Sequence, residues 1–495
     1  MPSRRRSAGA VLLTGFAVLA ACGNTIPVVP AGASAAPSAS ASSGGIDVTP
    51  YPLPSVDLGG DVEAGSITRH LQALDAIARE HDGIRTVGTP GYEASVEYIV
   101  GELQAIGFEV STPRFEVATF AEQPGGTITV MDGGPTYEAG DETHAMIYSA
   151  DGDVTAQVET VGFPDSPGGQ REMGCYENDW REFTAGRIAL TPPGPCLRRN
   201  TVEHAQQAGA VALVVANYGW EQGEALRPTL LSPDGIDIPV ISAIGEVGAG
   251  LQEAAEEGTE VHIQVDTDIG GTLVSNVIAQ HGSGGPVVML GAHLDSVLDG
   301  PGINDNGSGV AAVLEIAHLL ADAGHPGTIR VGFWAGEEFG LLGSRDYVTG
   351  LSPTDLDAMA AYINLDMLGS VNAVPMVYQN SDAPNGSHEI TEFLLAWLQA
   401  DGIAAEPENL SSGSDHHFFA QAGVPIGGIF SGASEVKSQD QAATNGGQAD
   451  EAMDPCYHLS CDTIQNVNAE QVASYAQAAA AASMALLGGR ITTGR

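Results

Sequence analysis

Basic side chains are scarce in this 495-residue chain, which has 18 lysines and arginines against 62 aspartates and glutamates. The formal net charge is -44, and Lys437 is the only lysine. A field of this sign argues against nucleic acid or an anionic membrane surface as a partner. The same field favours cations, including the free ammonium group of a peptide, although solubility alone is an alternative reason for the acidity.

Cysteine is also rare, with five residues and no Cys-x-x-Cys pair, so a thiolate zinc site is not expected. No loop has the EF-hand pattern, which leaves a calcium site possible but unsupported. Four cysteines lie close enough in sequence to form two disulfides, which an exported protein would keep. These pairs are Cys175 with Cys196 and Cys456 with Cys461.

The first 22 residues are predicted to be an export leader. Three arginines precede the apolar run Ala10 to Ala21, which is too short to remain in a membrane as a helix. The leader ends Leu19-Ala20-Ala21-Cys22, which resembles a bacterial lipobox and implies cleavage before Cys22 and lipid attachment to it. A plain secretory signal is the alternative. We expect a protein held at the cell surface by the lipid or released to the medium.

Hydrophobic residues make up 43% of the chain and charged residues 16%, which is typical of a globular protein with two or more domains. Residues 23–60 are predicted to be a disordered tether, because Ala, Ser, Pro and Gly dominate up to residue 50. Residues 61–135 begin the main domain. Two helical patterns, from Ser66 and over Tyr92 to Ile106, precede a predicted strand over Phe108 to Phe120.

Metal-binding side chains stand where predicted strands end. The apolar run Val287 to Leu290 leads into His293 and Asp295, and a Gly- and Asn-rich loop then carries Asp305 to a helix near Ser308. Open α/β sheets bind ligands at this edge. Two further predicted strands lead to acids. Thr328 to Trp334 is followed by Glu337 and Glu338, where a helix is expected to begin, and Ala361 to Asp366 ends in an acid itself.

His458 lies inside the short loop that the disulfide of Cys456 and Cys461 would close. Taken alone, each motif is also compatible with an ordinary loop cap, a helix N-terminal acid or an incidental histidine. Together the candidate ligands suit zinc, and five of them exceed one tetrahedral ion, so a bridging Asp would serve two ions about 3.5–4 Å apart. The candidates are His293, Asp305, Glu338, Asp366 and His458.

Five motifs in this order resemble the M28 family of co-catalytic zinc aminopeptidases. They read GAHLDS, GINDNGSG, AGEEFGLLGS, INLDMLGS and DPCYHLSCD. The resemblance covers Thr86 to Phe108 and about 271 to 487, and it makes 269–488 the zinc-binding part. It implies an α/β zinc-peptidase sandwich, with a central mixed sheet flanked by helices, that hydrolyses the N-terminal bond of peptides or proteins.

The resemblance also implies roles for single residues. One zinc ion is held by His293 and Asp366, the other by Glu338 and His458, and Asp305 bridges them. Glu337 matches the general base, Tyr457 a phenol that stabilises the oxyanion, and Asp295 an acid that orients His293. Residues Ser414 to His416 follow the family order as well and are expected to shape the substrate pocket, with a purely structural loop as the alternative.

Residues 136–268 resemble a protease-associated (PA) domain inserted into the peptidase. The match rests on three apolar strands in a familiar order, and it implies a β-rich lid without chemistry of its own. They are Gly186 to Leu190, Ala208 to Val215 and Ile238 to Ser242.

Two other functions stay open at this stage. A carboxypeptidase of the same fold would need a basic cluster for the terminal carboxylate, yet Arg345 is the only arginine beside the motifs. A non-catalytic surface-binding protein would have lost metal ligands, and none is missing here. A glutaminyl cyclase fits less well than a two-metal hydrolase. We expect a monomer that touches the membrane only through its lipid.

Overall fold

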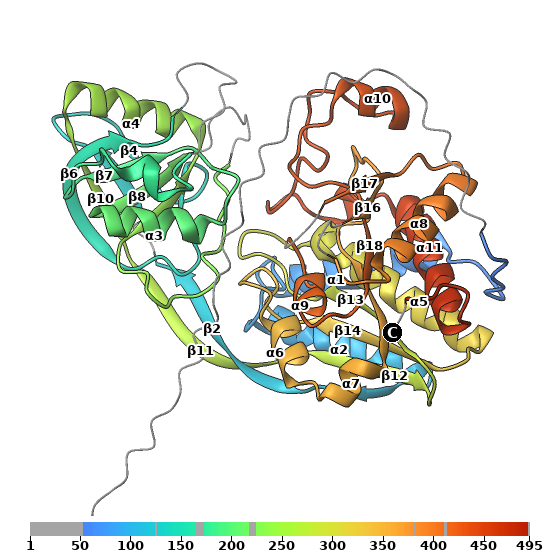
Figure 1. Ribbon diagram of the computed structural model, residues 1–495. Helices are drawn as coiled ribbons and strands as arrows, with labels where there is room; N and C mark the ends of the chain where they lie inside the picture. Colours follow the sequence, from blue (N-terminus) through green and yellow to red (C-terminus); the bar gives the residue numbers. More distant parts are fainter. Residues whose placement is uncertain are drawn as a thin grey trace, which may run out of the picture. The chain divides into compact units, whose positions relative to one another are not determined.

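The computed structural model describes residues 53–123, 126–163, 173–216, 224–379, 383–409 and 413–493. The predicted leader, Cys22 and most of the predicted tether fall outside these ranges. Two eight-stranded mixed sheets and a two-stranded ribbon organise the described chain (Figure 1). This arrangement confirms the predicted α/β class with a β-rich insertion. No helix within the described ranges combines the length and apolar character needed to span a bilayer.

The first sheet has the strand order β1-β12-β14-β13-β15-β18-β16-β17. Its centre is parallel, because β13 pairs in parallel with β14 and β15, and β15 pairs in parallel with β18. The carboxyl ends of these four strands therefore meet at one edge. The strands are β1 (Glu109–Ser111), β12 (Val277–Gly282), β13 (Val287–His293), β14 (Thr328–Trp334), β15 (Met359–Leu365), β16 (Met376–Tyr378), β17 (Glu406–Glu408) and β18 (Ile426–Phe430).

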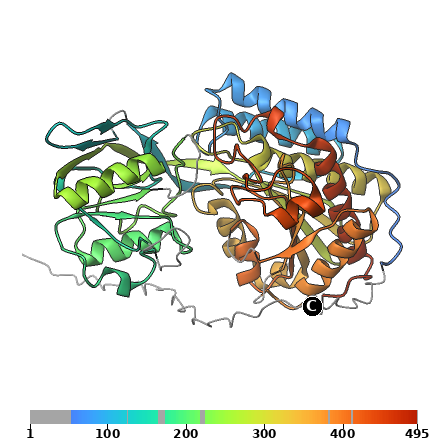
Figure 2. The ribbon, with the colours of Figure 1, turned by 90° about the horizontal axis from the view of Figure 1, so that it is seen from above.

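Helices cover both faces of this sheet (Figure 2). One face carries α1 (Ala64–Glu80), α2 (Pro90–Ala105), α5 (Gly309–Ala323), α8 (Ser387–Ala400) and α11 (Ala469–Leu487), and the other carries α6 (Leu342–Gly350), α7 (Pro353–Ala358) and α9 (His416–Gln421). Strand β13 follows the period of two that this burial requires. Val288 and Leu290 pack in the main core, whereas Met289 packs on the opposite face with Trp334 and Tyr362.

Two predicted boundaries in the first domain differ from the structure. The predicted strand from Phe108 to Phe120 is divided into β1 and β2 (Arg114–Glu122), because Pro113 cannot donate to a strand ladder. The predicted tether reaches residue 60, yet Leu58 is 5% exposed and belongs to the main core. Composition alone predicted the extent of the tether, whereas the burial of Leu58 shows that packed chain begins before residue 60.

The second sheet has the order β4-β3-β10-β6-β7-β8-β9-β5. It begins at β3, earlier than the predicted boundary at 136, because β3 pairs antiparallel with β10. The ribbon of β2 and β11 (Thr267–Ser275) joins it to the first domain. Its elements are β3 (Thr127–Val130), β4 (Thr136–Tyr137), β5 (Thr143–Ala145), β6 (Gly152–Thr160), β7 (Ile188–Thr191), β8 (Ala212–Ala216), β9 (Val240–Ala243), β10 (Glu260–Val265), α3 (Arg198–Ala208), α4 (Gly245–Glu257) and η1 (Glu177–Trp180). The predicted disulfide between Cys175 and Cys196 is confirmed.

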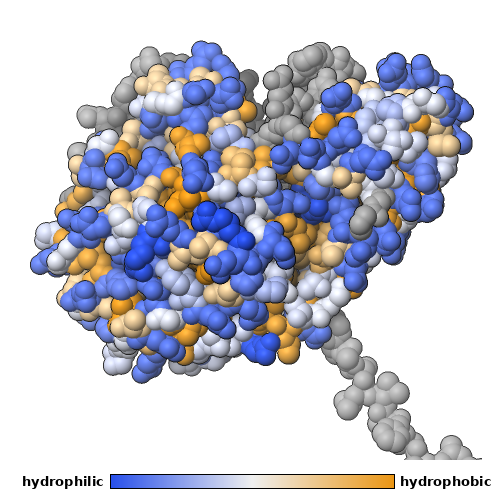
Figure 3. Space-filling model, turned by 180° about the vertical axis from the view of Figure 1, so that it is seen from behind, coloured by the Kyte–Doolittle hydropathy of each residue, from blue (hydrophilic) through white to orange (hydrophobic). Residues whose placement is uncertain are grey.

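The single lysine belongs to a connection between β18 and the C-terminal region that also carries α10 (Gln439–Asn445). Lys437 is 1% exposed, and its Nζ donates to the carbonyl oxygens of Asn372 and Ala373, at 3.3 and 2.7 Å. The charged amine of Lys437 therefore binds backbone carbonyl groups inside the fold. On the face in Figure 3, hydrophilic residues dominate and hydrophobic ones form small separate patches.

Arg227 ties the inserted domain to the loop that follows β13. Its guanidinium donates to both carboxylate oxygens of Asp299, at 2.9 and 3.0 Å, and to Glu122 on β2. It also lies 2.7 Å from Nδ1 of His144 on β5. Burial raises the pKa values of Glu122 and Asp299, but their polar contacts outweigh it. Contacts with His144 and Arg227 bring the pKa of Glu122 below its ordinary value, and contact with Arg227 does the same for Asp299.

Replacing Arg227 by glutamine is expected to reduce the free energy of unfolding by about 3 kcal/mol, because two largely buried carboxylates lose their cation. Arg187→Gln is the matched control, since its pair with Glu159 is more exposed and is worth no more than about 1 kcal/mol. Denaturant unfolding at neutral pH measures both changes. Equal losses in the two variants would contradict the assignment.

The cost of Arg227→Gln should also depend on pH. Groups with lowered pKa values add stability that is present above their unfolded pKa and is lost as the pH falls through the folded pKa. The ordinary values are 4.5 for Glu122 and 3.8 for Asp299. The gap between variant and unchanged protein should therefore be full at neutral pH and shrink as the solution is acidified below those values.

Candidate metal centre

Three parallel strands bring candidate ligands to one edge of the first sheet. His293 is the last residue of β13, and Asp366 directly follows β15. Glu337 and Glu338 lie in a turn shortly after β14. His293 and Asp366 are more than seventy positions apart in the sequence, yet they lie close together because their strands pair in parallel.

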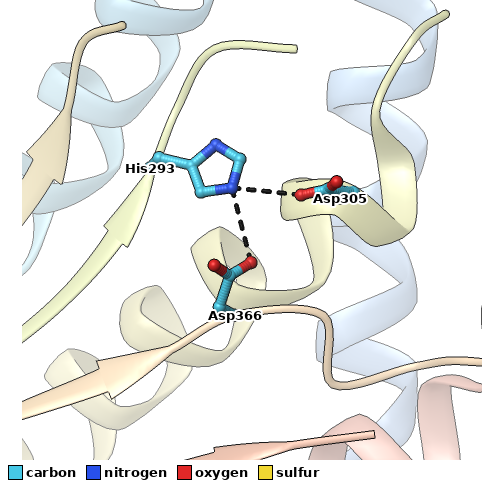
Figure 4. Close-up of side chains that lie close together, drawn as sticks. All are labelled: His293, Asp305 and Asp366. Atoms are coloured by element: carbon cyan, nitrogen blue, oxygen red, sulfur yellow. Dashed lines mark hydrogen bonds and ion pairs between the residues drawn. The ribbon is translucent and has the colours of Figure 1, made fainter. Parts of the chain in front are cut away.

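Asp305 lies between two groups of ligands and offers one carboxylate oxygen to each. Its Oδ1 is 3.1 Å from Nε2 of His293, and that nitrogen is 3.4 Å from Asp366 (Figure 4). Its Oδ2 is 3.2 Å from Nε2 of His458, which is 3.2 Å from Glu338. Asp305 belongs to the kinked segment η2 (Ile303–Ser308), and the peptide bond that follows it is cis.

The donor atoms fit a pair of divalent ions. His293, Asp305 and Asp366 offer atoms within 4.8 Å of one another, and so do Asp305, Glu338 and His458. The ligand sets are nitrogen and carboxylate oxygen, which zinc accepts. The buried Oε1 of Glu338 has no hydrogen-bond partner among the described residues. An unpaired charged oxygen in this position is costly unless a cation meets it.

The charges around the two imidazoles favour a cation at the same place. Burial lowers the pKa of His293, but Asp366 and Asp305 outweigh it and raise the value well above normal. Burial also opposes charge on His458, whose pKa Glu338 and Asp305 raise in the same way. The pKa of Asp305 is depressed by both imidazoles despite its burial. The cluster therefore demands positive charge where its nitrogen and oxygen atoms meet.

Glu337 and Glu338 precede a helix instead of beginning it. The sequence predicted a helix start at these acids, but α6 begins at Leu342 after a turn closed by the carbonyl of Glu337, which accepts from Gly340 and Leu341. Leu341 adopts a left-handed conformation with φ of 58°. Within this turn Glu338 faces His458, whereas Glu337 has no described ion-pair partner and is partly exposed.

Asp295 supports this turn more directly than it supports His293. Its Oδ1 accepts from the backbone nitrogens of Gly336 and Glu337, at 2.9 and 3.2 Å. The ring nitrogen Nδ1 of His293 lies 3.2 Å from the carbonyl oxygen of Asp295 and 3.9 Å from its carboxylate. The expected orientation of His293 by Asp295 thus runs through the backbone, while the carboxylate positions Glu337. Burial raises the pKa of Asp295 to about 7.

The predicted disulfide of Cys456 and Cys461 is confirmed, and it closes the loop that carries Tyr457 and His458. His458 has a positive φ of 61°, and its ring stacks on that of Tyr457 with centroids 3.8 Å apart. Burial, followed by Asp305, Glu338 and Glu337, raises the pKa of Tyr457 well above its ordinary value. The phenol therefore stays protonated and can donate a hydrogen bond.

Comparisons with known proteins show the family to which this chain belongs. The model of peptidase family M28 matches residues 276–483, and that of the PA domain matches 154–251. A "Probable lipoprotein aminopeptidase LpqL" of Mycobacterium tuberculosis is 39% identical over 84% of this chain and 83% of its own length. The chain belongs to peptidase family M28. An "Aminopeptidase" of Pseudomonas aeruginosa is 36% identical to this M28 chain over 87% of it and 81% of the relative.

Solved structures share the fold of this M28 protein. An aminopeptidase from Aneurinibacillus sp. strain AM-1 has a TM-score of 0.66 at 23% identity and covers 85% of this chain and 93% of that one. BSAP, a zinc aminopeptidase from Bacillus subtilis, has a TM-score of 0.64 at 24% identity, with 85% and 94% covered. These likenesses show that the chain shares the fold of both proteins.

Two acids beside the candidate metal centre were missed by sequence reasoning. Asp462 accepts from the backbone nitrogens of Asn304 and Asp305, at 2.8 and 3.0 Å, and so holds the segment that carries Asp305. Asp454 accepts from the side chain of Asn304, at 2.5 Å. Both acids stand at the ends of the quoted DPCYHLSCD motif. Their equal spacing on either side of His458 was the sequence signal that could have marked them as candidates.

Ser414 lies against one of the candidate ligands. Its hydroxyl donates to Oδ2 of Asp366 at 2.6 Å and accepts from Asn364 at 2.8 Å. Both contacts are buried, so Ser414 orients a candidate ligand.

Proposed function

We propose that this M28 protein is an exported aminopeptidase that removes N-terminal residues from peptides with the help of two zinc ions. The observation that carries the proposal is the division of the Asp305 carboxylate between two ligand groups. Relatives named as aminopeptidases, at 39% and 36% identity over most of the chain, support the reaction class.

Five residues would hold the metal. His293 and Asp366 would bind one ion, Glu338 and His458 the other, and Asp305 both. When bound, zinc supplies a Lewis acid that activates water and polarises the scissile carbonyl group. Everything else in the reaction falls to side chains that do not bind metal.

Glu337 would act as the general base. Burial raises the pKa of Glu337 well above normal; His293 opposes this rise, and Glu338 and Asp415 add to it. A carboxylate of this kind takes a proton from the attacking water and returns it to the leaving amine. The Tyr457 hydroxyl would donate to the oxyanion as it forms, and Asp295 would hold the backbone of Glu337 in place.

Cleavage at the first residue would follow from the surrounding charge. The free ammonium group of the substrate would lie among carboxylates, with Glu337 and Asp366 as its partners. An amine that carries an acyl group has no charge for these acids to bind.

Attachment at the cell surface through Cys22 is also part of the proposal. It rests on the lipobox-like sequence and on the lipoprotein name of the relative from Mycobacterium tuberculosis. Separation of cells into membrane and medium fractions, followed by detection of the protein, tests this part. Recovery of the unlipidated protein in the cytosol would contradict it.

Rates on a panel of aminoacyl-p-nitroanilides test the function. We expect leucine p-nitroanilide to be hydrolysed, the N-acetylated analogue to be inert, and the activity to vanish with a strong chelator and return with zinc. Metal analysis of the purified protein should give about two zinc ions per chain. Release of the C-terminal residue from an N-acetylated dipeptide would indicate a carboxypeptidase, and absence of zinc would indicate a non-catalytic protein.

A further inference from the structure

Arg85 is fully buried, and its guanidinium donates hydrogen bonds to backbone carbonyl oxygens near the candidate metal centre. Nε donates to the carbonyl of Pro301 at 3.0 Å, Nη2 donates to that of Gly302 at 2.6 Å, and Nη1 donates to that of Leu294. Leu294 follows His293 directly, and Gly302 lies shortly before Asp305. The Arg85 side chain thus binds both ends of the loop that connects His293 with Asp305.

The backbone beside Arg85 strengthens the same contact. Its nitrogen donates to Oγ of Ser296 at 2.9 Å, and the next hydroxyl, that of Thr86, donates to the carbonyl of Val297 at 2.6 Å. The loop from 294 to 302 is irregular and contains no ladder of its own. Without this segment the buried carbonyl groups of Leu294 and Pro301 would lose the guanidinium donors described above, and buried polar groups must be paired.

The charge of Arg85 is not used in an ordinary ion pair. Within the described residues, no carboxylate lies within 4.0 Å of its nitrogens. Burial lowers its pKa to about 10, and Asp295, Asp462 and Asp305 act against that fall. The group therefore stays charged at neutral pH and serves as a cation behind the acidic centre. The guanidinium holds five donors in a fixed planar fork that reaches three separate carbonyls, whereas an ammonium has three donors on one compact nitrogen.

We propose that Arg85 is a positioning residue of the metal centre, which fixes the 294–302 loop so that His293 and Asp305 meet the same ion. This inference rests on the proposed two-zinc function. Loss of Arg85 would change two things with opposite signs. Removing a cation by itself favours zinc binding, whereas freeing the loop disfavours it. Arg85→Lys keeps the charge and breaks the three-carbonyl contact, so this variant isolates positioning.

Zinc affinity of the full chain, measured by competition with a chromogenic chelator, tests the inference. Arg85→Lys should bind zinc about 10- to 100-fold more weakly, the scale found when groups behind metal ligands are changed. Hydrogen exchange of the metal-free protein should be faster in the 294–305 segment than in the unchanged chain. Arg79→Lys is the matched control, because this arginine lies on α1 with 67% of its side chain exposed.

Unchanged zinc affinity in a folded Arg85→Lys protein would overturn the inference while leaving the proposed function intact. If the unchanged chain itself binds no zinc, both fail. If Arg85→Lys does not fold, Ser296→Ala takes its place, since it removes the hydroxyl that accepts from the Arg85 backbone and donates to the Val297 carbonyl. Zinc binding by Ser296→Ala should then be weakened, and wild-type affinity would overturn the inference.

Discussion

Replacing Glu337 by glutamine is expected to leave zinc binding intact and to lower kcat at least about a hundredfold. Glutamine has the same shape and preserves the backbone contact with Asp295. It cannot accept the proton of the attacking water, so the loss should fall on kcat more than on KM. The neighbouring Glu338 keeps its position 3.2 Å from His458 and can still bind metal.

Glu80→Gln is the control for this experiment, because this glutamate is exposed at the end of α1, remote in sequence from every candidate ligand. It removes the same charge and should leave kcat unchanged. Zinc content and rate on leucine p-nitroanilide are measured on each protein. A fully active Glu337→Gln enzyme with two zinc ions would exclude Glu337 as the base.

Replacing Asp305 by alanine is expected to abolish activity and to remove both zinc ions instead of one. Each ligand group would keep only two side chains, and the two cations would lose the anion between them. The fold should persist, because Asp462 binds the backbone nitrogens of this segment and not its side chain. Metal analysis of the purified variant gives the stoichiometry.

Asp357→Ala, at an exposed position of α7, is the matched control and should retain two zinc ions and full activity. Circular dichroism of Asp305→Ala verifies that the chain is folded. Retention of a single tightly bound zinc ion by Asp305→Ala would mean that one site is complete without the bridge. Retention of both would contradict the shared-ligand geometry.

Local pattern was enough to predict the strands that carry the candidate ligands. The apolar runs before His293 and Glu337 are buried β13 and β14, and both disulfides formed as expected. A polar residue directly after a buried strand is a strong local signal, because parallel pairing fixes where it lies. The resemblance to the family added the expectation of which ligands would share an ion.

Long-range contacts were beyond the reach of such patterns. Arg85 meets the loop after β13 across more than two hundred positions, and nothing in its own neighbourhood announces that contact. The turn before α6 was mistaken for a helix start, since acids are common at both places. The early start of the second sheet depends on pairing between β3 and β10, which composition does not encode.

The burial of Lys437 leaves amine chemistry with almost nothing to modify. Active esters, aldehydes and most cross-linking reagents need an accessible ε-amino group, and the only one in the sequence is held against two carbonyl groups. Labelling or immobilisation of the folded protein would thus have to use its many carboxylates. Trypsin, too, would find only arginines to cut in the native chain.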